Sequence, residues 1–112
     1  MKNLTHLKES KRIEPRNPTE AGIACRPFTS GFIKNSDGVM RNFSSVGSYI
    51  ETSGKFEPGT ILLVRMTQFP SSPSSNAAVD KPRSISLAEI KWVQELTEGS
   101  SVCYGMGVRY LE

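Results

Sequence analysis

The sequence predicts an all-β domain in which about five to seven antiparallel strands form a barrel or a sandwich. Three observations lead to this class. Large apolar side chains alternate with other residues throughout 102–111, which is the period of a β-strand. Turn-forming residues recur at 35–38, 57–59 and 98–100, as expected where strands reverse direction. Little of the chain shows the spacing of an amphipathic helix.

The predicted strands begin after residue 20 and are separated by these turns. Residues 60–66 are apolar on both faces as far as Arg65, which is typical of a strand well inside a sheet. Before the last hairpin, the candidate strands lie at 23–28, 32–34, 39–43, 49–52 and 60–66. The segment 32–34 is either a separate strand or a continuation of 23–28.

Residues 85–96 fit two patterns. Leu87, Ile90 and Val93 have the spacing of a helical stripe. In a strand, Ala88, Ile90 and Trp92 would instead share one face, with Glu89, Lys91 and Val93 on the other. Periodicity therefore leaves both structures open. The closing segment that follows is a clear strand, and its Gly105 and Gly107 fall on one face. Such a pair predicts a close approach by another strand, a side chain or a ligand.

Residues 1–20 are predicted to form a flexible N-terminal arm, and residues 21–112 a single barrel domain. Pro15 and Pro18 end any helix that begins before them, because proline lacks a backbone donor and biases its predecessor toward extended geometry. Residues 68–84 contain three prolines, so we expect a long mobile loop that can serve as a partner-binding element.

The composition argues against several kinds of site. Cys25, Cys103 and His6 are the only cysteines and histidine, and they lack metal-ligand spacing. We therefore expect no metal centre and no disulfide scaffold. No apolar run approaches the roughly 20 residues that span a bilayer, and a secretory signal is lacking. We expect a cytoplasmic protein without membrane insertion, and its net charge of +3 permits an anionic partner.

Two short motifs carry the candidate chemistry. Arg12 and Arg16 lie on a segment that proline keeps extended or turned. Guanidinium groups are permanently charged, offer forked donors to phosphate and stack on bases. The second motif comprises Asn42, Ser44 and Gly47, whose polar side chains cap turns or reach a purine and whose glycine permits a reversal. Taken singly, the first motif fits a solvated basic tail and the second an ordinary turn.

In this order and spacing, the two motifs resemble the signature of the PilZ domain family. The similarity runs from about residue 11 to residue 112. It implies a six-stranded antiparallel β-barrel with little helix, and it implies that 85–96 form a strand with a bulge near Leu87 and Ala88. The segments that resemble strands of this family lie at 49–52, 59–64, 90–93 and 104–111.

The resemblance further implies a bacterial, non-enzymatic receptor for the second messenger cyclic di-GMP, without another cofactor. In this role Arg12 and Arg16 would bind the phosphates and guanine bases of the ligand. Asn42 and Ser44 would hydrogen-bond a guanine, and Gly47 would let the ligand lie close to the backbone. Signal transduction to motility, biofilm or exopolysaccharide control would run through a downstream protein partner.

Two more residues enter as hypotheses. Lys11 precedes the first arginine, and a cation there would help to hold a self-stacked pair of ligands, whose phosphates concentrate negative charge. Trp92 provides either a stacking surface beside the site or a core side chain on an internal strand face. Whether one or two ligands bind stays open, and so does the oligomeric state, a homodimer included.

Three other functions were weighed. A PilZ-fold adaptor that binds protein partners without nucleotide is the alternative, although intact motif residues argue against it. A barrel that binds DNA or RNA would need exposed aromatics interleaved with basic residues, and those present are scattered. An enzyme is disfavoured because the sequence offers no Ser/His/Asp set, metal cluster or phosphate-binding Gly-rich loop.

Overall fold

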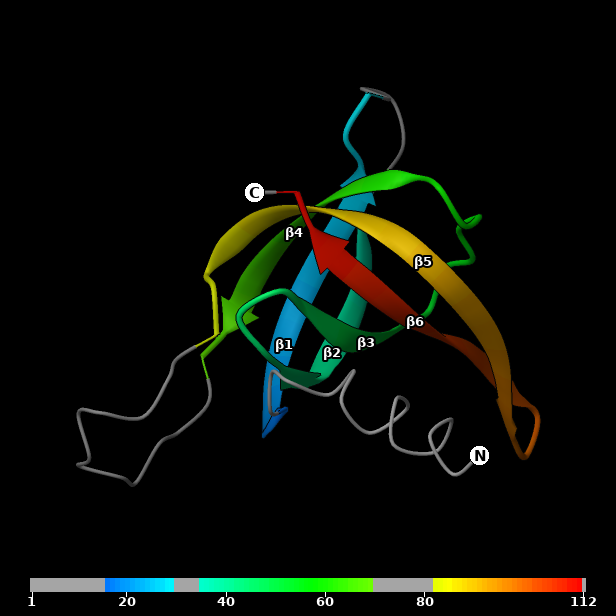
Figure 1. Ribbon diagram of the computed structural model, residues 1–112. Helices are drawn as coiled ribbons and strands as arrows, with labels where there is room; N and C mark the ends of the chain where they lie inside the picture. The colour runs from blue at the N-terminus through cyan, green and yellow to red at the C-terminus, as the bar shows by residue number, and fades with distance from the viewer. Residues whose placement is uncertain (1–15, 30–34, 70–81, 112) are drawn as a thin grey trace, which may run out of the picture.

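Six antiparallel strands make up the computed structural model, which describes residues 16–29, 35–69 and 82–111. Neighbouring strands pair in the order β1-β2-β3-β6-β5-β4, and the sheet closes into a barrel (Figure 1). The predicted all-β barrel of six antiparallel strands is thereby confirmed, and these residues contain no helix. The strands are β1 (Asn17–Pro27), β2 (Ser36–Phe43), β3 (Gly47–Thr52), β4 (Ile61–Gln68), β5 (Ile85–Glu98) and β6 (Ser101–Tyr110).

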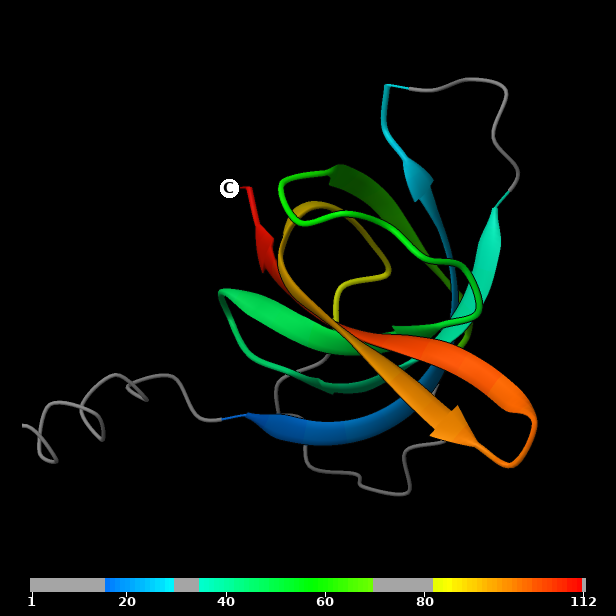
Figure 2. The same ribbon diagram turned by 90° about the vertical axis from the view of Figure 1, so that its right-hand side faces the viewer.

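Strand β1 closes the ring, because it pairs with β2 on one side and with β4 on the other (Figure 2). Ala21 lies opposite Met40 of β2, and Cys25 lies opposite Val64 of β4. Pairing on both sides satisfies the backbone donors and acceptors of the strand. The first strand of the chain is therefore an integral part of the barrel.

The core fills the interior of the ring, and every strand contributes to it through inward-facing side chains. Burying one such aliphatic side chain stabilises the fold by roughly 1.5–3 kcal/mol. Each strand supplies one large apolar side chain that is essentially inaccessible to solvent, and these are Ile23, Met40, Ile50, Leu62, Ile90 and Met106.

The ambiguous segment 85–96 is a strand, in agreement with the resemblance and against the helical alternative. It belongs to β5, which pairs with β4 on one side and with β6 on the other. Ala88 and Ile90 are buried, but Trp92 is exposed. The inward alternation is therefore interrupted within this strand.

A β-bulge causes this interruption. The register of β5 against β6 shifts between Ile90 and Trp92, which leaves Lys91 as an extra residue. An extra residue in one strand reverses the faces of the residues that follow. The bulge predicted at Leu87 and Ala88 is wrong, because these two residues pair regularly with β4.

Strand β1 begins earlier than the sequence indicated. Asn17 pairs with Phe43, and Pro18 pairs with Asn42, so residues 17–20 belong to the barrel instead of the predicted arm. The register then shifts between Pro18 and Ala21, and a proline is compatible with such an irregularity. Residues 1–15, most of the predicted loop at 68–84 and the strand candidate at 32–34 lie outside the described residues.

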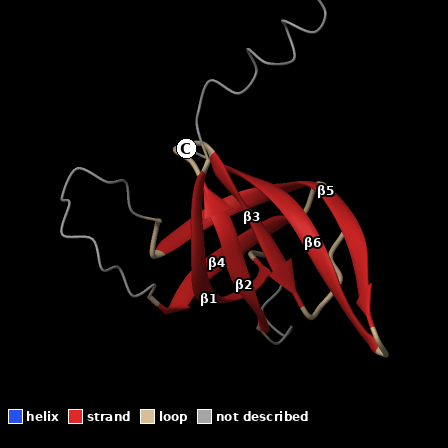
Figure 3. Cartoon of the chain, turned by 90° about the horizontal axis from the view of Figure 1, so that it is seen from below, coloured by secondary structure: helices blue, strands red, loops and turns tan. Residues whose placement is uncertain are grey.

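Strands β5 and β6 extend beyond the ring as a hairpin (Figures 1 and 3). Residues 96–103, called the projecting hairpin below, pair only with each other within the described part of the chain. Gly99 has a φ of 67°, which suits the first central residue of a two-residue hairpin turn. Across 16–29, 35–69 and 82–111, no helix is long and apolar enough to cross a membrane.

Candidate functional site

One end of the barrel collects the predicted binding residues that the structure describes. Strands β1 and β3 begin at this end, and strands β2 and β6 finish there. Asn17 therefore lies opposite Phe43, while Gly47 lies opposite Arg109. The topology brings Arg16, which directly precedes β1, beside the turn that joins β2 to β3.

Arg16 contacts the second motif directly. Its Nη1 donates a hydrogen bond to Oδ1 of Asn42 at 3.0 Å, although 26 residues separate the two in sequence. The contact is exposed, so the guanidinium remains accessible to a ligand. Asn42 is half-buried and is held by β-pairing with Pro18 and Tyr49. One arginine of the first motif and the first residue of the second thus form a single cluster.

The turn between β2 and β3 is stabilised by its own atoms. The Ser44 N–H donates to the Gly47 carbonyl at 2.8 Å, and the Val46 N–H donates to Ser44 Oγ at 3.2 Å. Ser44 is only 5% exposed, so its side chain is part of the turn. A hydroxyl that accepts one hydrogen bond keeps its own hydrogen as a donor. Ser44 therefore supports the turn first, and any bond to a ligand would be additional.

Gly47 is required by packing against β6. A Cβ at this position would overlap the carbonyl oxygen of Val108 and would lie 3.2 Å from Cα of Arg109. Backbone atoms cannot move aside as a flexible side chain would, so only glycine lets the two strands approach this closely. The pairing of β3 with β6 thus explains the glycine at position 47, while its predicted role of letting a ligand lie close to the backbone stays a prediction.

Arg83 and Tyr110 complete this end of the barrel, and the sequence analysis missed both. The guanidinium carbon of Arg83 lies 4.2 Å from the centroid of the Tyr110 ring, within the range of a cation–π contact. Tyr110 is also tied to the turn, because its N–H donates to the Val46 carbonyl at 2.8 Å. Alternation places Tyr110 on a strand, but it gives no sign of this partner far away in sequence.

The electrostatics at Tyr110 reflect its crowded position. Burial, the largest effect, raises the pKa of its phenol, while Ser48, Arg83 and Arg16 act in the opposite direction. Ser48 is near enough to lower that pKa, yet the two hydroxyls do not meet hydrogen-bond geometry. Both are buried without a hydrogen-bond partner in the described structure. Arg16 and Arg83 thus both place positive charge near one buried tyrosine.

An exterior row of residues leads away from Asn42 across three further strands. Asn42 lies opposite Tyr49 of β3, Tyr49 opposite Gly107 of β6, and Gly107 opposite Trp92 of β5. The Tyr49 and Trp92 rings stack with centroids 5.6 Å apart and an interplanar angle of 21°. The row therefore ends in an aromatic pair on the outside of the barrel.

The same row explains the two glycines of β6. A Cβ at Gly107 would overlap the Trp92 indole, and a Cβ at Gly105 would overlap the Tyr49 ring. The predicted close approach is thus made by side chains. Trp92 is 46% exposed, so the alternative of a core tryptophan is wrong, and its ring is available as a stacking surface.

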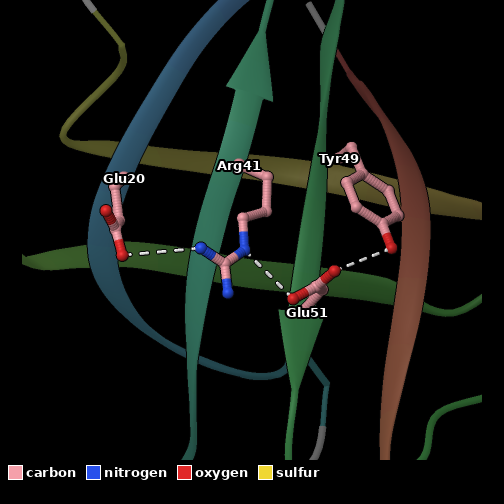
Figure 4. A network of polar contacts seen from close by, with 4 residues as sticks. All are labelled: Glu20, Arg41, Tyr49 and Glu51. Atoms are coloured by element: carbon pink, nitrogen blue, oxygen red, sulfur yellow. Dashed lines mark hydrogen bonds and ion pairs between the residues drawn. The ribbon is translucent and has the colours of Figure 1, made fainter. Parts of the chain in front are cut away.

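A polar network lies beside this aromatic pair (Figure 4). Arg41 Nε donates to Glu51 at 3.0 Å, and its Nη1 lies 3.5 Å from Glu20. The Tyr49 hydroxyl donates to the other Glu51 oxygen at 3.0 Å. The hydrogen bond with Glu51 raises the pKa of Arg41, and burial followed by the Glu51 contact raises the pKa of Tyr49. The network holds β1, β2 and β3 together on the outer surface and fixes the Tyr49 ring.

Lys11 and Arg12, the remaining predicted binding residues, lie outside the described residues. Within those residues, no group of three or more His, Cys, Asp or Glu side chains is arranged to hold a metal ion. Chemically, the barrel end offers guanidinium donors, an amide and a rigid turn, and an aromatic surface lies nearby. In comparisons with known proteins, no family model matches this chain and no curated protein shows significant similarity to it.

Proposed function

We propose that this chain is a receptor for cyclic di-GMP, which binds at the barrel end that carries Arg16 and the β2–β3 turn. The observation that carries the proposal is the 3.0 Å hydrogen bond from Arg16 to Asn42. It joins two motifs whose combination resembles the PilZ signature. The pairing of Pro18 with Asn42 places Arg16 beside this asparagine.

The chemistry of the cluster suits a cyclic dinucleotide. The guanidinium of Arg16 is exposed enough to meet a phosphate, with which it can form two parallel charge-assisted hydrogen bonds. The Asn42 amide offers both a donor and an acceptor, as recognition of a guanine base requires. In the free protein the Arg16–Asn42 bond holds these two groups near each other. Binding would exchange this bond for bonds to the ligand.

The fixed part of the proposed site is rigid. Ser44 is buried and hydrogen-bonded within the turn, and Gly47 packs against the backbone of β6. Such preorganisation lowers the entropy cost of binding, which mobile groups would otherwise impose. Lys11 and Arg12 would add their charges from the N-terminal arm and clamp the ligand against this surface.

The aromatic pair provides a second surface for the same ligand. Tyr49 is the strand neighbour of Asn42, and Trp92 stacks on Tyr49 with 46% of its surface exposed. Stacking of a base on an aromatic side chain contributes roughly 1–3 kcal/mol. A guanine held by Asn42 would therefore have the Tyr49 ring on the neighbouring strand and the Trp92 ring stacked beyond it.

Calorimetric titration of cyclic di-GMP into the full chain tests the proposal. We expect saturable binding to the wild type and a loss of about ten- to hundredfold in affinity for Arg16→Ala, as for removal of a hydrogen bond to a charged group. Arg26→Ala is the matched control, since Arg26 lies toward the opposite end of β1. It should bind as the wild type does.

Two outcomes would overturn the proposal in different ways. If the wild type gives no binding heat at saturating nucleotide, the chain is no cyclic di-GMP receptor, and the adaptor function gains support. If the wild type binds but Arg16→Ala binds equally well, the ligand lies elsewhere on the molecule. The stoichiometry of the same titration decides between one ligand and a stacked pair near Lys11.

A further inference from the structure

Arg83 occupies a position that mirrors Arg16 around the β2–β3 turn. In the strand order β1-β2-β3-β6-β5-β4, Arg16 reaches the turn from the β1 side. Arg83 lies two residues before Ile85, the start of β5, and its guanidinium lies over the ring of Tyr110 at the end of β6. Because the Tyr110 N–H bonds to Val46 of the turn, the turn is flanked by a guanidinium on each side.

Arg83 contacts Tyr110 through a cation–π interaction. A guanidinium carries five N–H donors, and such a contact does not require an acceptor for them. No described residue accepts a hydrogen bond from Arg83 or forms an ion pair with it. The side chain is exposed, so an external anion can reach these donors.

The backbone around Arg83 is anchored. The Ser84 carbonyl accepts a hydrogen bond from the Met66 N–H at 2.8 Å, and Ile85 pairs with Arg65 of β4. The Tyr110 ring then limits where the side chain can go. A charge fixed in this way loses less conformational entropy on binding than one on a free side chain.

We propose that Arg83 is a third arginine of the nucleotide site and binds a phosphate of the ligand on the side of the turn opposite Arg16. This inference rests on the proposed function. A cyclic dinucleotide carries two phosphodiester charges on opposite sides of one ring, which matches two guanidiniums on opposite sides of one turn. A mononucleotide such as GMP offers one phosphate in place of two, so it would lose one of these contacts.

Tyr110 supports Arg83 through its ring and not through its hydroxyl. The phenol oxygen is buried and lacks a hydrogen-bond partner among the described residues, whereas the ring carries the guanidinium. Tyr110→Phe therefore keeps the support and removes the unpaired oxygen. This variant separates a role of the aromatic platform from a role of the phenol.

The test is calorimetric titration of the full chain with cyclic di-GMP, and with GMP in parallel. We expect Arg83→Ala to weaken cyclic di-GMP binding about ten- to hundredfold, with Arg83→Lys in between because it keeps charge but loses the fork and the flat face. The control Arg26→Ala should bind as the wild type does, and Tyr110→Phe should lose far less affinity than Arg83→Ala because its ring remains. GMP should bind far more weakly, with little difference between wild type and Arg83→Ala.

Salt dependence gives a readout that a merely structural role would not change. If Arg83 neutralises a phosphate, affinity should fall less steeply with salt in Arg83→Ala than in the wild type. Loss of binding with Arg16→Ala but full binding with Arg83→Ala would overturn this inference and leave the proposed function intact. A wild type that does not bind would remove both. A salt slope unchanged in Arg83→Ala would rule out the phosphate contact.

Discussion

Strands β5 and β6 contribute both to the closed ring and to the projecting hairpin, yet their residues lie in opposite surroundings in these two regions. In the ring, Met106 and Val108 of β6 are buried between β3 and β5. In the projecting hairpin, Val102 belongs to the same alternating series but is 43% exposed. Alternation therefore predicts which side chains share a face, but coverage of that face depends on strands far away in sequence.

The turns of the two regions differ in the same way. In the ring, Gly47 at the end of the β2–β3 turn has backbone atoms of β6 against it, and Ser44 is buried. In the projecting hairpin, Gly99 has no atom within 4 Å of the position of a Cβ, and Ser100 is exposed. The β2–β3 turn is held by β6 as well as by its own hydrogen bonds, while the β5–β6 turn depends on local conformation alone.

Thiol labelling should show the largest difference between the regions. Cys25 is fully buried in the ring, and burial, with a smaller effect from Asp37, raises the pKa of its thiol to about 12. Because the thiolate is the reactive form and exposure requires opening of the core, we expect a maleimide at pH 8 to modify Cys25 about a thousandfold or more slowly than half-buried Cys103.

Single-cysteine variants make this measurement specific. Cys103→Ala reports on Cys25, and Cys25→Ala reports on Cys103. In concentrated urea the two thiols should react at similar rates, since the unfolded chain protects neither. Comparable rates in the native protein would contradict the contrast between the ring and the hairpin.

Alanine at the two glycines should give the next largest effect. Gly47→Ala forces a Cβ onto the β6 backbone, and overpacking at such a position costs up to about 3 kcal/mol. Gly99→Ala has open space but must keep a φ of 67°, which costs about 1 kcal/mol. Urea denaturation measures both free energies of unfolding. Equal losses would mean that β3 and β6 separate easily at the site.

Serine-to-alanine changes in the two turns should give the smallest effect. Ser44→Ala leaves the Val46 N–H without the oxygen that accepts its hydrogen bond, so we expect a loss of about 1 kcal/mol in unfolding free energy. Ser100→Ala, in the exposed turn, should change stability by less than about 0.5 kcal/mol. The same urea experiment compares them, and a larger effect at Ser100 would reverse the ranking of the two turns.

Much of the fold follows from local sequence signals. The alternation at 102–111 and the turns at 57–59 and 98–100 predicted strands and reversals that the structure contains, whereas the turn predicted at 35–38 is wrong because residues 36–38 belong to β2. The resemblance resolved 85–96 correctly as a strand. Gly105 and Gly107 signalled a close approach, although the sequence did not tell whether a strand, a side chain or a ligand makes it. The alternation and the turns depend on residues near each other in the chain.

The features that the sequence did not reveal depend on pairing between distant strands. The bulge at Lys91 arises where β5 leaves β4 and continues with β6, and it decides that Trp92 faces outward. The early start of β1 depends on Asn17 finding Phe43. In the candidate site, the structure places Arg16 and Asn42 in contact, and their joint role in binding stays a prediction. Arg83 became visible only through its contact with Tyr110.

Closure of the ring has a consequence for self-association. Among the described strands, β5 beyond Ile90 and β6 before Tyr104 offer an edge to another chain, and β1 before Gly22 offers another on the side of β4. Exposed edges invite ordered aggregation, and bulges and charges oppose it. Here the β5 edge carries the bulge at Lys91, and Glu95 and Glu98 add charge. The protein can thus project a long hairpin into solvent while resisting the strand-by-strand addition that leads to fibres.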